Sequence, residues 1–137
     1  MKIFYSCFGG AHSSVTAAAI HMGYLPSDRL PTIREILTVP FYDKAENHQI
    51  GLANFMGIDA GQCEIYFLGL GHARDYYTGI LYEFINEINL HKKNEIIVID
   101  VTPLLNSRTR LGGFMSRRLN IVNIGRPLTA YGILKNY

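Results

Sequence analysis

The sequence contains no tryptophan, only two cysteines among its 137 residues, and no long apolar run. The two cysteines, Cys7 and Cys63, are too few for the disulfide framework of a small secreted domain, so they favour a reducing cytoplasm. No run approaches the roughly 20 apolar residues of a membrane span, and no targeting segment precedes the first apolar run. We therefore expect neither a membrane protein nor an exported one.

Charge of one sign is also scarce, since the formal net charge is only +2. Such a small excess gives no reason to expect nucleic acid as the partner, although five arginines fall within nineteen residues near the carboxyl end. The hydrophobic content of 48% is ample for a packed core, and the length is that of one typical domain. We expect residues 1–137 to form a single α/β domain.

The amino-terminal segment, residues 2–22, predicts a strand, a turn and a helix. The apolar MKIFYSC is bounded by Gly9 and Gly10 and is typical of a buried strand. The alanine-rich SVTAAAIHM starts with a serine and is followed by Gly23, which are helix start and stop signals. Together they make half of a βαβ unit.

The rest of the chain continues this alternation of strands and helices. It predicts a three-layer α/β sandwich with a mainly parallel sheet and one antiparallel strand. Apolar positions in 72–90 follow one helical face, and EIIVIDV is typical of a central strand covered on both sides. The expected elements are a short helix at 32–37, a loop at 41–51, a hairpin of strands 52–59 and 63–69, a helix at 72–90, a strand at 95–101, a helix at 104–119 and a last strand at 121–124.

In such sheets, ligands bind beyond the carboxyl ends of the parallel strands. Four segments are expected to meet there, namely 8–14, 69–74, 100–110 and 125–127. The first is FGGAHSS, in which two glycines allow a turn whose N–H groups point inward. We expect a phosphate group at this loop, and the alternative is a tight connection that binds nothing. The phosphate-binding residues would be Gly9, Gly10, Ala11, Ser13 and Ser14.

The loop resembles the nucleotide-binding P-loop in its two-glycine variant. Ser14 resembles the hydroxyl that binds magnesium, and the strand that ends at Asp100 resembles the aspartate strand of these proteins. The lysine that bridges the phosphates is replaced by Ser13. The resemblance therefore implies a nucleotide or phosphate site without the usual route to ATP hydrolysis.

The same loop also resembles that of low-molecular-weight protein tyrosine phosphatases. Cys7, Gly9 and Ser14 match the cysteine, glycine and serine of their motif, so the resemblance implies a nucleophilic Cys7 thiolate. The motif's arginine falls at Ser13. The alternative for Cys7 is a small buried residue at the end of a strand.

An arginine from elsewhere in the chain could supply the missing cation, since guanidinium binds phosphate in a bidentate manner. Arg117 and Arg118 are expected to lie on the solvated surface. His12 and His72, at the same edge of the sheet, are candidates for acid-base chemistry together with Asp100, or for anion binding. No close-spaced pair of ligands indicates a metal, and the sequence points to no particular cofactor. The candidate arginines are Arg108, Arg110 and Arg126.

Three longer segments carry a resemblance that spans most of the chain: CFGGAHSSVTAAAIH, then MGID followed by EIYFLGLG, and RLGGFMSRRLNIVNIGRPL. They resemble a family of uncharacterised bacterial proteins known as a domain of unknown function and frequent in spore-forming bacteria. That resemblance implies no activity.

The leading hypothesis is thus a protein that binds a phosphate-bearing small molecule or nucleotide, with or without turnover. One alternative is a phosphatase that depends on Cys7. The other is a regulatory or scaffold domain without catalysis, which could form a homodimer through an apolar face.

Overall fold

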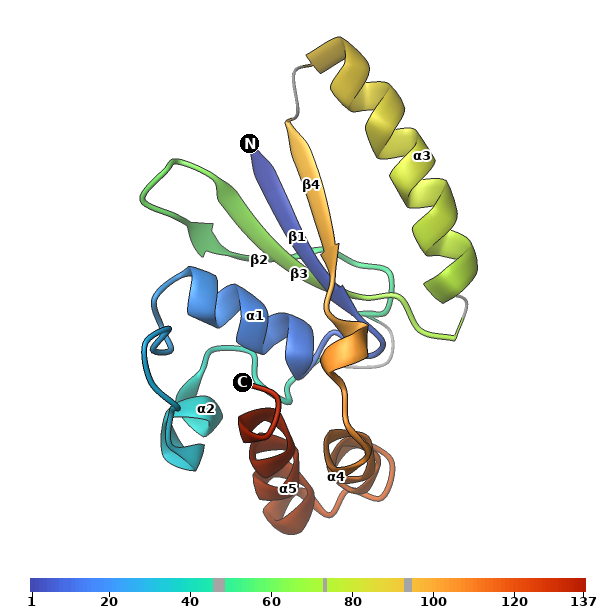
Figure 1. Ribbon diagram of the computed structural model, residues 1–137. Coiled ribbons are helices and arrows are strands. Elements are labelled where there is room, and N and C mark those ends of the chain that lie inside the picture. The colour runs from blue at the N-terminus through green and yellow to red at the C-terminus, as the bar shows by residue number, and fades with distance from the viewer. Residues whose placement is uncertain (46–48, 73, 93–94) are drawn as a thin grey trace.

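The computed structural model describes residues 1–45, 49–72, 74–92 and 95–137, and its strands form one mixed sheet in the order β2-β3-β1-β4 (Figure 1). Strand β1 runs parallel to both β3 and β4, and β2 runs antiparallel to β3. The mainly parallel sheet with one antiparallel strand is therefore confirmed, as is the hairpin. The strands are β1 (Lys2–Cys7), β2 (Asn54–Ile58), β3 (Glu64–Gly69) and β4 (Ile96–Asp100).

The prediction of a central strand at 95–101 is wrong, because β4 pairs with β1 alone within the described residues and lies at the edge of the sheet. The central place belongs to β1, which pairs on both sides. Ile97 and Ile99 remain 38% and 39% exposed. A run of branched apolar residues indicates a strand but does not distinguish an edge strand from a central one.

Helix α1 (Ser13–His21) covers one face of the sheet, against β1 and β3. Its small side chains, among them Ala18 and Ala19, are fully buried with Ile65 of β3, so the helix approaches the sheet closely. The short helix predicted at 32–37 is confirmed as α2 (Ile33–Thr38), which Thr32 and Glu35 begin with a capping box. The hydrophobic core lies between these two helices, the carboxyl-terminal helix and the sheet.

Helix α3 (Arg74–Lys92) packs against β4, where the Tyr82 hydroxyl donates to the Val98 carbonyl oxygen at 3.2 Å. Figure 1 shows α3 beside this edge strand. Only part of its apolar surface is covered. The prediction that the apolar positions of 72–90 form one buried face is therefore wrong. The sequence period defines an apolar stripe but not the width of the surface that covers it. The exposed positions are Tyr76, Tyr77, Ile80 and Phe84.

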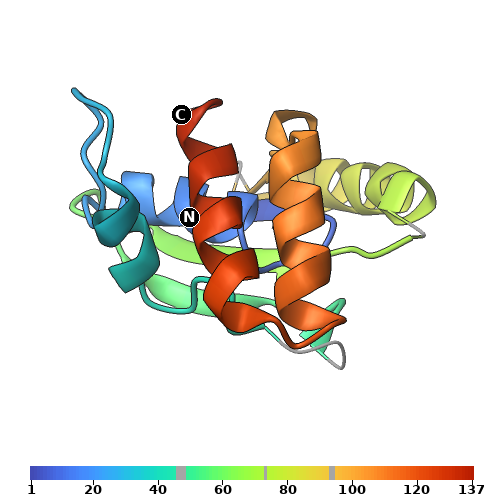
Figure 2. The same cartoon turned by 90° about the horizontal axis from the view of Figure 1, so that it is seen from below.

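The strand predicted at 121–124 is also wrong, since these residues begin α5 (Val122–Leu134), which lies beside α4 (Ser107–Arg117) (Figure 2). A run of four apolar residues is too short to show whether its hydrophobic period is that of a strand or that of a helix. The helical form is favoured by close packing, because a methyl group added at Gly112 would lie 2.7 Å from the Gly125 carbonyl oxygen. The turn η2 (Thr102–Leu104) leads from β4 to α4. In the described part of the chain, no helix has the length and apolar character to span a membrane.

Candidate functional site

The loop between β1 and α1 folds back over the sulfur of Cys7. The thiol is buried at 2% exposure, and its Sγ accepts a hydrogen bond from the Gly10 N–H at 3.2 Å. The Ser14 hydroxyl lies 3.2 Å from the same sulfur, and either group can donate. The loop thus surrounds the Cys7 thiol with polar groups.

Gly10 is required at this turn by its backbone and by its neighbours. Its φ is +64°, and a methyl group added to it would lie 2.7 Å from the Gly69 nitrogen at the end of β3. A side chain on Gly69 would likewise collide with the loop backbone. Packing alone therefore explains Gly10, and this glycine is not by itself a sign of a ligand.

Polar groups at the start of α1 lack some of their hydrogen-bond partners. The first N–H groups of any helix lack partners within the helix, and the cap residue His12 offers no side-chain hydrogen bond to them. No acidic side chain lies in the first turn. Ser13 is 4% exposed, and its Oγ has no hydrogen-bond partner in the structure as described. The buried hydroxyls of Ser6, Thr16, Thr78 and Thr102 also lack a partner among the described residues, and that of Ser13 lies in the first turn of α1, at the positive end of the helix dipole.

His12 lies in the first loop as predicted, and its ring is buried against the carboxylate of Asp43. Its Nε2 lies 2.8 Å from Asp43 Oδ1, and these side chains are 10% and 1% exposed. Asp43 Oδ2 accepts a hydrogen bond from the Ser116 hydroxyl at 2.5 Å. These contacts fix the orientation of the His12 ring relative to the loop.

Asp43 is ionised in this network. Burial raises its pKa, but the hydrogen bonds from His12 and Ser116, together with the charges of His12 and Arg117, outweigh burial and lower the pKa below its ordinary value. The Asp43 N–H also donates to the Ala11 carbonyl oxygen at 2.9 Å. Sequence reasoning assigned residues 41–51 to an undefined loop and missed Asp43, since no motif or spacing marks it.

The arginine that reaches the loop is Arg117, which corrects its assignment to the solvated surface. Its Nη1 donates to the Gly9 carbonyl oxygen at 3.4 Å, across 108 positions of sequence. Arg117 is half-buried, whereas Arg118 is exposed as expected. The pair is adjacent in sequence, and only the position of α4 relative to the loop separates their environments.

The three arginines predicted to supply the cation lie elsewhere. Arg126 does not follow a strand as predicted, because it belongs to α5, where its Nη2 donates to the carbonyl oxygens of Leu37 and Tyr42. The Arg108 guanidinium lies over the Tyr131 ring at 5.3 Å. Arg110 is exposed on α4. Since 125–127 is helical, that segment does not join the edge of the sheet.

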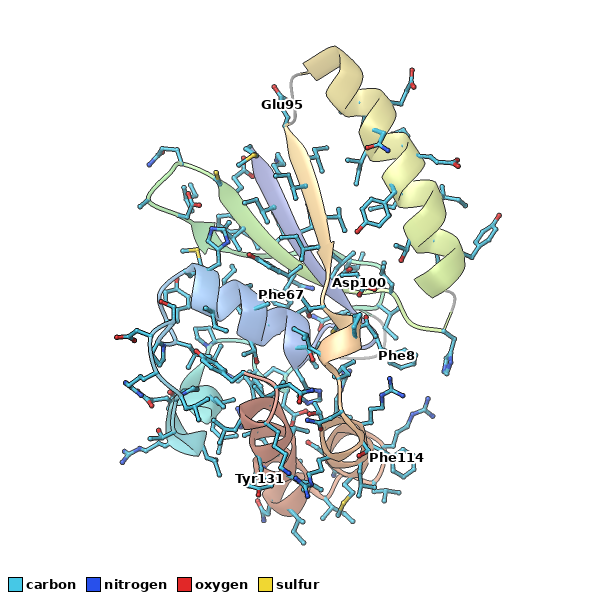
Figure 3. All side chains as sticks on the ribbon, viewed as in Figure 1. Phe8, Phe67, Glu95, Asp100, Phe114 and Tyr131 are labelled. Atoms are coloured by element: carbon cyan, nitrogen blue, oxygen red, sulfur yellow. The ribbon has the colours of Figure 1, made fainter. Side chains whose placement is uncertain are left out.

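Asp100 and His72 do lie near the end of β1, but neither contacts Cys7. Asp100 pairs in register with Ser6, so its side chain points to the opposite face of the sheet from Cys7. Its Oδ1 accepts the Thr102 N–H at 2.9 Å. His72 is exposed, with its ring edge-on to Phe8 at 4.9 Å. Figure 3 shows Asp100 and Phe8 at the same end of the sheet.

The arrangement therefore combines a folded-back loop, a helix start, a buried thiol and one arginine. Segments 8–14, 69–72 and 100–104 meet at this end of the sheet, through contacts such as the Leu70 N–H with the Cys7 carbonyl oxygen at 2.9 Å, while Ala73 lies outside the described residues. Among the residues that the structure describes, no three histidine, cysteine or acidic side chains are grouped so that they could hold a metal ion. The loop thus brings together N–H and hydroxyl groups and one guanidinium.

No curated protein and no solved structure matches the chain. One protein family does match, over residues 2–137, and its description is "Protein of unknown function (DUF3189)". The match extends over nearly the whole chain, from the first residue of β1 to the carboxyl end. The chain therefore belongs to the DUF3189 family.

Proposed function

We propose that the loop of residues 7–14 binds the phosphate group of a small molecule or nucleotide. The observation that carries this proposal is the buried Ser13 hydroxyl, which has no partner within the described structure and lies in the first turn of α1. Phosphate oxygens are strong acceptors for such a hydroxyl and for the free N–H groups of a helix start.

The charges around the loop favour an anion. The first turn of α1 carries no carboxylate, and the nearest acidic partner of the loop, Asp43, is already paired with His12. Arg117 adds one positive charge at Gly9. Negative charge on a ligand would therefore meet a helix dipole and a guanidinium with no opposing free carboxylate among these contacts.

The test is a thermal-shift screen of the protein with inorganic phosphate, nucleotides and sugar phosphates. Ser13→Asp is the sharpest control, because a carboxylate at this helix start repels a bound anion. Ser27→Asp makes the same change at an exposed position. We expect a phosphate compound to raise the melting temperature of the wild type and of Ser27→Asp but not of Ser13→Asp. Equal shifts in all three proteins, or none in the wild type, would contradict the proposal.

A second candidate function, phosphatase activity through Cys7, is favoured by the two polar contacts to its sulfur. In this reaction the thiolate attacks phosphorus, the ester P–O bond breaks and the alcohol leaves with a proton. Water then cleaves the phosphocysteine to release phosphate and regenerate the thiol. Hydrolysis of an aryl phosphate should vanish in Cys7→Ser and persist in Cys63→Ser. Activity retained in Cys7→Ser would exclude this mechanism.

A further inference from the structure

Gly9 and Arg117 are matched in a way that the backbone does not explain. Gly10, Gly23, Gly51 and Gly71 have positive φ, whereas Gly9 does not, so Gly9 has no conformational need for glycine. A methyl group added at Gly9 would instead lie 3.2 Å from Arg117 Nη1. The missing side chain leaves space that the guanidinium uses.

Arg117 is held near the loop by the residue beside it. The Ser116 hydroxyl donates to Asp43, and Asp43 is joined to the loop through the His12 side chain and the Ala11 backbone. Asp43 is nearly inaccessible, so this connection is shielded from water. The end of α4 is thereby fixed against the start of α1.

Within the described residues, the Arg117 guanidinium makes one long hydrogen bond. Its contact with the Gly9 carbonyl oxygen is long, at 3.4 Å, and the residues described in the structure give its other N–H groups no partner. A guanidinium has five N–H donors in a planar fork that matches two phosphate oxygens. Arg117 therefore retains the donors that a bound anion would need.

We propose that Arg117 is the anion-binding cation of the loop, supplied by α4 in place of the cation that is missing at Ser13, and that Gly9 is needed to admit its guanidinium. This inference rests on the proposed phosphate site. Two other arginines of this region are engaged away from the loop, since Arg126 donates to two carbonyl oxygens and Arg108 lies over Tyr131.

Isothermal titration with inorganic phosphate at constant ionic strength tests the role of Arg117. A charge-assisted hydrogen bond implies that Arg117→Ala weakens binding by about 10- to 100-fold. Arg117→Lys should recover part of the loss, since it keeps the charge without the fork. Arg118→Ala removes the same charge from the exposed neighbour and should bind phosphate like the wild type. The melting temperature without phosphate should be unchanged in Arg117→Ala, which separates ligand binding from a structural role.

The pairing with Gly9 is tested by a double-mutant cycle. Gly9→Ala should weaken phosphate binding in the wild type and have little further effect in Arg117→Ala. If the wild type binds phosphate and Arg117→Ala binds it equally well, Arg117 is not the cation, although the phosphate site stands. If Gly9→Ala weakens binding equally in both backgrounds, the pairing is wrong. If the wild type binds no phosphate, the proposed function and this inference fail together.

Discussion

The Asp43 carboxylate lies 2.8 Å from His12 Nε2, and the two side chains, 1% and 10% exposed, connect the first loop of the chain to a segment 31 positions later. The second Asp43 oxygen accepts from Ser116 on α4. Three distant segments thus share one buried carboxylate. The integrity of the loop should depend on this carboxylate more than on any exposed ion pair.

Asp43→Asn should lower the free energy of unfolding by about 1.5–3 kcal/mol, because an amide replaces the buried carboxylate that is hydrogen-bonded to His12 and Ser116. Guanidinium-induced unfolding measures the effect. Asp28→Asn, at an exposed position, should change the free energy by no more than about 0.5 kcal/mol. Similar unfolding midpoints for the two variants would show that the pair contributes little.

The same carboxylate predicts a pH dependence. Because the folded-state pKa of Asp43 lies below its ordinary value of 3.8, its contribution is fully present above that value and is lost as the pH falls through the folded-state pKa. The difference in unfolding free energy between wild type and Asp43→Asn should therefore narrow as the pH falls below about 4. A difference that widens on acidification would mean that the folded protein raises this pKa.

Glycine-to-alanine substitutions at Gly10 and Gly79 should change the stability of the protein in opposite directions. Gly10→Ala should destabilise the protein by at least about 1 kcal/mol, because its φ is +64° and the new methyl group meets the Gly69 backbone. Gly79→Ala, within α3 and with no atom within 4 Å of the new methyl group, should stabilise it by about 0.5–1 kcal/mol. Thermal unfolding of both variants checks this, and destabilisation by Gly79→Ala would contradict the described helix.

Arg126→Met should lower stability and leave phosphate affinity unchanged. Arg117→Ala should do the reverse. Removing the guanidinium leaves the Leu37 and Tyr42 carbonyl oxygens without their donor, which should reduce stability by about 1–3 kcal/mol. Phosphate affinity, measured at a temperature where the variant is folded, should be unchanged. A loss of affinity without a loss of stability would place Arg126 at the ligand instead.

The local elements of the amino-terminal half could be predicted from the sequence because their signals are short in range. The glycines after Cys7, the alanine-rich run and the Thr32 to Glu35 capping box each act over a few residues. The hairpin is indicated in the same way by the short turn between its two strands. These predictions are confirmed by β1, α1, α2 and the β2-β3 pair.

The predictions from sequence fail where tertiary contacts determine the conformation or the environment of a residue. Residues 121–124 form a helix because α4 offers a closely fitting surface at Gly112, which no local pattern reveals. Arg117 and Arg118 are chemically equivalent in the sequence, and only the approach of α4 to Gly9 separates them. Asp43 is likewise identified by the groups that converge on it, which come from positions 12 and 116.

The most direct test of the phosphate site is a crystal structure of the protein with tungstate, a tetrahedral dianion whose anomalous scattering locates it without ambiguity. We expect tungstate within the 7–14 loop, in contact with the Ser13 hydroxyl and with Arg117. Tungstate bound elsewhere on the protein, with the loop free of it at a concentration that saturates those other sites, would contradict the account.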